Sequence, residues 1–270
     1  MKRTRLLAAA AALLVCAPLS AAATAHAATI TMSGSTSVAP LTTKLAKAFV
    51  NTPQGKGNKV VILQGGSDIG ITDVSRGRVT LGMSSRDPKP ADPGGIVFNK
   101  VARDAVCVVS NSANRIPTLS QSLIQDIFAG RVRSWSQVPG ASADGPIDLV
   151  VRTAASGTQD AFQNIFMGQT LRVAASAATK SSNGLQAQTI KSNPNAIGYA
   201  SFAFTRGLHT IPYQGVPCTL RNAKSGQYAG SRNFFLVSRG AAKGIAKDFI
   251  KFARSRKGQQ IVGSEWVPLR

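Results

Sequence analysis

Three short stretches rich in glycine and hydroxyl side chains could together bind an oxyanion. They are SGSTSVAPL at residues 33–41, GGSD at 65–68 and ASGT at 155–158, and each lies between a strand-like apolar run and a helix-like pattern. The amino end of a helix presents unpaired N–H groups, glycine lets an anion approach them, and hydroxyls add further donors. Helix capping alone explains any one such stretch. Three of them with a nearby arginine favour an anion site.

Arg152 is that arginine, four residues before Ser156. A guanidinium can donate two parallel hydrogen bonds to a tetrahedral anion, although a surface ion pair is its alternative role. Each charge-assisted bond contributes about 1.5–3 kcal/mol, and micromolar affinity needs only about 8 kcal/mol. A few good donors therefore suffice, and we expect neither a metal nor a cofactor.

The elements that would position these residues alternate along the chain. We expect strands at 29–32, 60–63, 79–83, 105–109, 147–152, 197–202 and 234–237. Helical spacing relates Leu41, Leu45, Ala48 and Phe49; Leu123, Ile127 and Phe128; Phe162, Ile165 and Phe166; and Ile245, Phe249 and Phe252. This alternation predicts an α/β protein with a mainly parallel sheet, whose ligands bind at the carboxyl ends of strands. Ser37 is a candidate N-cap, with Pro40 in the first turn.

The first 27 residues have the pattern of a secretory signal peptide. Three basic residues precede an apolar run at 6–15, and a small-residue stretch ends in Ala-His-Ala. The apolar run is too short to span a bilayer, and we expect cleavage after Ala27, with Ala23 as the alternative. Because Val15 precedes Cys16, we favour a released, periplasmic or wall-associated protein over a lipoprotein.

The mature chain keeps two cysteines, Cys107 and Cys218, and a large positive charge. In an oxidising compartment the two cysteines could form a disulfide, but the sequence alone leaves the pairing open. The whole chain carries 32 basic and 11 acidic residues, so loss of the three leader cations leaves 29 − 11, or +18. That charge favours anionic partners, from small anions to polyanions.

In this order the stretches resemble the motifs of the phosphate-binding proteins of bacterial ABC importers. The matching segments are 34–41, 65–67, 82–86, 127–130 with Trp135, Arg152 with 156–158, 193–199, and 226–228 followed by Ser231 and Arg232. The resemblance spans nearly the whole mature chain. It implies a two-domain periplasmic-binding-protein fold of type II, with a hinge and a ligand cleft between domains. Domain I would comprise 28–109 plus 205–270, and domain II 110–204.

The resemblance also implies roles for individual residues. It places the ligand-binding groups at Ser35, Thr36, Ser37, Ser67, Arg152, Ser156, Gly157 and Thr158, and the closed form would be recognised by a membrane ABC permease. One position departs from the pattern: Ser85 stands where many members carry an aspartate that accepts the proton of hydrogen phosphate. Sulfate and molybdate therefore stay open as ligands. Arg86 would add positive charge, and Asp68 or Asp87 could serve as acceptor or pair with an arginine.

Two other classes of function compete with anion capture. A hydrolase is disfavoured because Ser156-Gly157 lacks the G-x-S-x-G pattern, His209 is the one histidine of the mature chain, and no His/Cys cluster has metal-ligand spacing. The +18 charge could serve polyanion binding. The signal peptide and the few aromatic residues argue against nucleic acid, whereas anionic cell-wall polymers remain a secondary partner. We expect a monomeric, non-enzymatic, extracytoplasmic binding protein.

Overall fold

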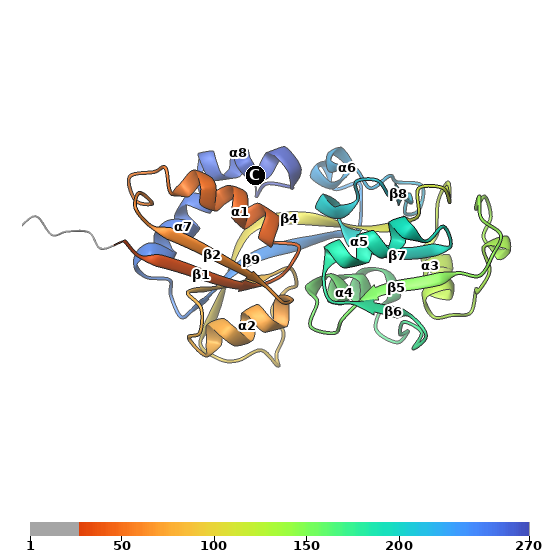
Figure 1. The fold of residues 1–270 in the computed structure, drawn as a ribbon, viewed down its shortest axis with the longest axis horizontal. Coiled ribbons are helices and arrows are strands. Elements are labelled where there is room, and N and C mark those ends of the chain that lie inside the picture. Colours follow the sequence, from red (N-terminus) through yellow and green to blue (C-terminus); the bar gives the residue numbers. More distant parts are fainter. Residues whose placement is uncertain (1–26, 270) are drawn as a thin grey trace, which may run out of the picture.

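The computed structural model describes residues 27–269, so the expected signal peptide at 1–27 lies almost wholly outside the described residues. Within this part, two α/β lobes are joined by two long strands (Figure 1). No helix between residues 27 and 269 combines the length and apolar character that crossing a membrane requires.

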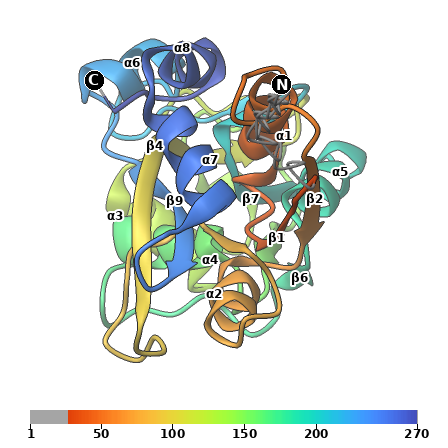
Figure 2. The ribbon, with the colours of Figure 1, turned by 90° about the vertical axis from the view of Figure 1, so that its left-hand side faces the viewer.

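The first lobe contains a parallel sheet whose strands end toward the second lobe. Its strands are β1 (Thr29–Gly34), β2 (Lys59–Gln64) and β3 (Leu81–Ser84); its helices are α1 (Ala39–Phe49), α2 (Ser67–Ser75), α7 (Gly244–Arg254) and α8 (Arg256–Glu265). α1, α7 and α8 cover one face of the sheet in one core, which contains Trp266, and α2 covers the other face (Figure 2). The sheet is thus enclosed on both sides, as parallel sheets require.

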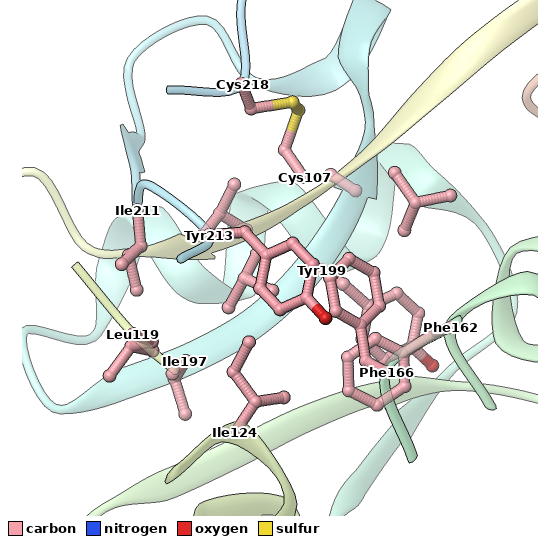
Figure 3. Packing of buried hydrophobic residues seen from close by; sticks show 14 of the residues in the cluster. Cys107, Leu119, Ile124, Phe162, Phe166, Ile197, Tyr199, Ile211, Tyr213 and Cys218 are labelled. Atoms are coloured by element: carbon pink, nitrogen blue, oxygen red, sulfur yellow. A yellow bond between two sulfur atoms is a disulfide. The ribbon is translucent and has the colours of Figure 1, made fainter. Parts of the chain in front are cut away.

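The second lobe also combines parallel strands with helices. Its strands are β5 (Asp148–Arg152), β6 (Ala178–Lys180), β7 (Ala196–Ser201) and β8 (His209–Thr210); its helices are α3 (Gln121–Phe128), α4 (Gly157–Phe162), α5 (Asn183–Ser192) and α6 (Leu220–Ser225). Short turns η1 (Trp135–Gln137), η2 (Gln163–Met167) and η3 (Phe202–Phe204) complete it. Phe162 stacks on Tyr199 with ring centroids 4.0 Å apart, in a core that also buries Trp135 (Figure 3). This core holds the end of α4 through Ala161 and Phe162.

An antiparallel ribbon of β4 (Ile96–Ser110) and β9 (Ser231–Arg239) connects the lobes. It is paired from Ile96 opposite Arg239 to Ala105 opposite Ser231, and β4 then continues beside β7. The strand order is β2-β1-β3-β9-β4-β7-β5-β6. The predicted parallel pairing therefore holds within each lobe, but not in the ribbon. The expected strand at 105–109 is too short: β4 begins at Ile96, and the polar and charged residues within 99–104 separate its first apolar run, 96–98, from the expected one.

Cys107 on β4 and Cys218 after β8 form a disulfide, with Cα atoms 5.7 Å apart (Figure 3). Both lie in the core of the second lobe, as do Ile211, Tyr213 and Tyr228. The domain bounds 28–109 plus 205–270 and 110–204 stay a prediction. This packing leads us to propose that the second boundary falls nearer to β9 than to residue 205.

Candidate functional site

The loops after β1, β2, β3 and β5 meet between the two lobes. Ser37 Oγ lies 2.9 Å from Oγ1 of Thr158, which joins the loop after β1 to the start of α4. Ser35 Oγ donates to Ser85 Oγ at 2.8 Å, and Ser85 Oγ lies 3.3 Å from Ser67 Oγ. All five side chains are buried. Three strands of one lobe and one of the other therefore direct hydroxyl groups to the same place.

Ser37 is not the N-cap of α1, contrary to the expectation from the sequence. Val38 occupies that position without a side-chain hydrogen bond, and Pro40 lies in the first turn as expected. Ser35 Oγ instead accepts hydrogen bonds from the N–H groups of Ser37 and Val38, at 3.2 and 3.4 Å. The hydroxyl of Ser37 is therefore free of the helix and is directed into the space between the lobes.

The first residues of α4 lie in close contact with the first lobe. Ser156 is its N-cap and accepts hydrogen bonds from the N–H groups of Thr158 and Gln159. A Cβ atom on Gly157 would lie 2.3 Å from Ser67 Oγ and 2.6 Å from Ser85 Oγ. Real contacts of a Cβ are never so short, so only glycine lets this helix terminus reach the hydroxyls of the first lobe.

Arg152 ends β5 and is 3% exposed. Its Nε and Nη2 donate to the carbonyls of Lys180 and Ser181, at 3.1 and 2.8 Å. Its Nη1 is buried without a hydrogen-bond partner, and no carboxylate in residues 27–269 forms an ion pair with it. Burial lowers the pKa of Arg152 to about 10, and the nearby charge of Arg232 acts in the same direction. The site therefore contains a guanidinium whose charge is not compensated.

A second buried guanidinium, Arg232 on β9, was missed as a site residue. Its Nη2 donates to Ser37 Oγ and its Nη1 to Thr158 Oγ1, both at 2.9 Å. Behind it, Asp104 Oδ2 accepts from Nη2 at 2.8 Å. Burial raises the pKa of the Asp104 carboxyl, and the charge of Arg232 opposes that shift. In the sequence, the signal that could have identified Arg232 as a site residue is its place in one of the segments that resemble the family's motifs.

Asn183, the first residue of α5, was also missed. Its Nδ2 donates to Thr36 Oγ1 at 2.8 Å and to Ser37 Oγ at 2.9 Å. In the other loops a glycine stands directly beside a hydroxyl residue. Here Asn183 separates Gly184 from the hydroxyl residues that precede α5, so the stretch does not match the other loops. We call the whole set the cradle: Ser35, Thr36, Ser37, Ser67, Ser85, Arg152, Ser156, Gly157, Thr158, Asn183 and Arg232.

The neighbouring charged residues considered from the sequence are already paired. Arg86 Nε donates to Asp68 Oδ1 at 2.7 Å, and its Nη2 donates to Asp92 Oδ1 at 2.6 Å. Two carboxylates thus compensate Arg86, which adds no free charge to the cradle. Asp87 Oδ1 accepts a hydrogen bond from Asn233.

His209 is not part of the cradle. His209 lies on β8, and its Nε2 is 2.8 Å from the carbonyl oxygen of Ile116. Over the part of the chain that the structure describes, no three His, Cys, Asp or Glu side chains gather as a metal site. The arrangement therefore offers hydrogen-bond donors and positive charge.

Comparisons with known proteins agree with this geometry. A family model described as a PBP superfamily domain matches residues 20–257. "Phosphate-binding protein PstS" of Bacillus subtilis is 25% identical over 247 residues, which cover 89% of this chain and 80% of the relative.

Solved structures extend the similarity to three dimensions. A putative phosphate ABC transporter substrate-binding protein from Clostridium perfringens, solved with bound phosphate, is 30% identical with a TM-score of 0.84, over 90% of this chain and all of the other. An ABC-type phosphate transport receptor from Vibrio cholerae is 27% identical with a TM-score of 0.71, over 88% and 99% of the two chains. The type II fold expected from the sequence is thereby confirmed. The chain belongs to the PBP superfamily and, within it, to the phosphate-binding proteins of bacterial ABC importers.

Proposed function

We propose that the protein captures inorganic phosphate in the cradle by hydrogen bonding, without converting it, and delivers it to a membrane ABC permease. The observation that carries the proposal is Arg152: among residues 27–269, its buried Nη1 has no hydrogen-bond partner and no carboxylate pairs with its charge. An uncompensated buried charge is strongly unfavourable. A tetrahedral anion beside the hydroxyls would supply both the missing charge and the missing acceptor.

The preferred oxyanion depends on Ser85. A hydroxyl can accept a hydrogen bond from the O–H of hydrogen phosphate or donate one to a fully ionised oxygen. Sulfate and molybdate are therefore alternative ligands, since no carboxylate at this position repels them.

Calorimetric titration of the mature chain, residues 28–270, with phosphate, sulfate, molybdate and arsenate tests the proposal. We expect phosphate to bind with micromolar affinity or better. A preference for sulfate would keep the site and change its ligand, whereas absence of binding by every oxyanion would exclude the function.

The described state has the two lobes in direct contact. The Lys89 ammonium forms an ion pair with Asp160 across the lobes, and the N–H of Asp68 donates to the carbonyl of Ala155 at 3.1 Å. We infer that phosphate stabilises this closed arrangement through hinge motion of the ribbon, and that the permease recognises it.

A second, weaker activity is suggested by the exposed side of α7 and α8. Six exposed basic side chains lie there: Lys243, Lys247, Lys251, Arg254, Arg256 and Lys257. We propose that this surface contacts anionic cell-wall polymers rather than nucleic acid, in a monomeric, non-lipidated protein cleaved after Ala27. Such binding should weaken steeply as salt rises, whereas phosphate capture in the cradle should change less.

A further inference from the structure

A cavity of about 430 Å³ lies between the lobes, beside the cradle. Its walls come from the loop after β3, from α4 and from the ribbon. Ser85 and Arg232 line this cavity and also belong to the cradle. The two spaces therefore adjoin, and we call the cavity the vestibule.

Most charged residues around the vestibule are already paired. Arg86 is held by Asp68 and Asp92, and Lys89 forms its ion pair with Asp160. Arg232 is held by Asp104. These cations contribute little net charge to the vestibule, because each has a carboxylate beside it.

Lys100 and Arg103, both on β4, are the exception. Their side chains are half-buried and form neither an ion pair nor a hydrogen bond with any residue in the described range 27–269. Two carboxylates line the vestibule: Asp160 is paired with Lys89, and Asp87 accepts a hydrogen bond from Asn233, whose neutral amide leaves the charge of Asp87 in place. Within the described range, two unpaired cations against one unpaired carboxylate thus line a cavity that adjoins a site built for an anion.

We propose that the vestibule is a second oxyanion subsite, in which Lys100 and Arg103 hold an incoming phosphate dianion before it enters the cradle. The inference rests on the proposed phosphate function. Lys100 and Arg103 both lie on the ribbon side of the vestibule, and cations gathered on one wall of a concave site concentrate an anion and raise its association rate. The vestibule lacks the dense hydroxyl donors of the cradle, so the anion is held there briefly and passes on.

The test is rapid-mixing kinetics of phosphate binding, followed by tryptophan fluorescence, for the double variant Lys100→Gln/Arg103→Gln. Glutamine removes the charge but keeps an extended polar side chain, so the ribbon should still pack. The matched control is Lys47→Gln/Lys56→Gln, which removes two exposed charges from α1 and the loop after it, at the far end of the first lobe (Figure 1). Thermal unfolding of both proteins establishes that they fold, and each single variant replaces the double one if it does not.

At low salt we expect the association rate constant of the double variant to fall about tenfold, as loss of electrostatic steering predicts. The dissociation rate constant should stay within about twofold, because the cradle is intact and affinity resides there. The difference from wild type should shrink at high salt, where the charges are screened. The control variant should associate at nearly the wild-type rate.

The outcomes separate the two proposals. If the wild-type protein binds phosphate and the Lys100/Arg103 variant associates as fast as the control, the vestibule is not a subsite and the phosphate function stands. If the wild-type protein binds no phosphate, both proposals are wrong.

Discussion

Asp104 and Arg232 lie opposite each other on β4 and β9, and a single carboxylate oxygen holds the guanidinium at two points. Oδ2 of Asp104 accepts from Nε at 3.1 Å and from Nη2 at 2.8 Å. Both side chains are buried. The same guanidinium donates to Ser37 of the first lobe and Thr158 of the second. The hinge ribbon therefore connects directly to both walls of the cradle.

Replacing Asp104 by asparagine should destabilise the protein strongly. The change preserves shape but leaves the buried charge of Arg232 without a counter-ion, so the free energy of unfolding should fall by about 3 kcal/mol. Urea denaturation measures it. Asp126→Asn, which breaks a half-exposed pair with Arg131, is the control and should change stability by less than about 1 kcal/mol. Equal effects of the two substitutions would show that the buried pair has no special role.

Replacing Ser85 by aspartate should increase the preference for phosphate over sulfate. A carboxylate accepts the proton of hydrogen phosphate but repels an anion that has none, so the affinity ratio should rise at least about tenfold. Calorimetry with both anions measures the ratio. Ser85→Asn has a similar size without the charge, and it should leave the ratio near that of wild type. A ratio that rises equally in both variants would point to size rather than charge.

Gly157→Ala should weaken phosphate binding. The added Cβ collides with the hydroxyls of Ser67 and Ser85, which must move apart and misplace the donors around the ligand. We expect at least about a tenfold loss of affinity, equivalent to 1.4 kcal/mol. Gly94→Ala is the matched control, because nothing lies within 4 Å of its added Cβ. Wild-type affinity in the Gly157 variant would mean that the lobes do not meet here when phosphate binds.

Phosphate affinity should fall as the pH rises through about 10. Burial lowers the pKa of Arg152 to about 10 in the free protein, and a bound anion raises it again. Binding therefore takes up a proton above this pH, and affinity decreases there, whereas below it Arg152 is already charged. Calorimetry at pH 8, 9 and about 10.5 tests the sign.

Arg152→Ala supplies the control for that pH dependence. At neutral pH it should bind phosphate at least about tenfold more weakly, since charge-assisted bonds are lost. It should also lack the additional fall near pH 10. If the variant binds phosphate as tightly as wild type, Arg152 does not bind the ligand. If its affinity falls near pH 10 as in wild type, other groups cause the pH dependence.

Replacing both Cys107 and Cys218 by alanine should lower the free energy of unfolding by about 2–5 kcal/mol, because the bridge closes a long loop in the unfolded chain. The two residues are separated by 111 positions in the sequence. Both lie in the core of the second lobe, so phosphate affinity should stay close to wild type. Denaturation of the reduced wild-type protein should give the same loss. Equal stability with and without the bridge would contradict this account.

Local sequence patterns are enough to identify the three donor-rich loops and the elements around them. Strand, loop and helix patterns are local, so residues 33–41, 65–68 and 155–158 could be assigned to the carboxyl ends of strands without knowledge of the tertiary fold. Arg152 could likewise be proposed from its position four residues before Ser156. The resemblance of their order to a known family then added the two-lobed architecture. The structure places Ser35, Ser37, Ser67, Ser85, Gly157 and Thr158 against one another, while Arg152 and Ser156 lie at the end of β5 and the start of α4. That these residues bind the ligand stays a prediction.

The other groups of the cradle, Arg232 and Asn183, are identified from contacts between distant parts of the chain. Arg232 lies 195 positions from Ser37, and Asn183 lies 147 positions from Thr36. No local pattern relates residues so far apart. The charged part of β4 lacks an apolar run, so the ribbon that places Asp104 opposite Arg232 follows from long-range strand pairing. The local pattern likewise assigns Ser37 to a helix cap, because its hydrogen-bond partners are distant in the sequence. They are Thr158 and Asn183 of the other lobe and Arg232 of β9.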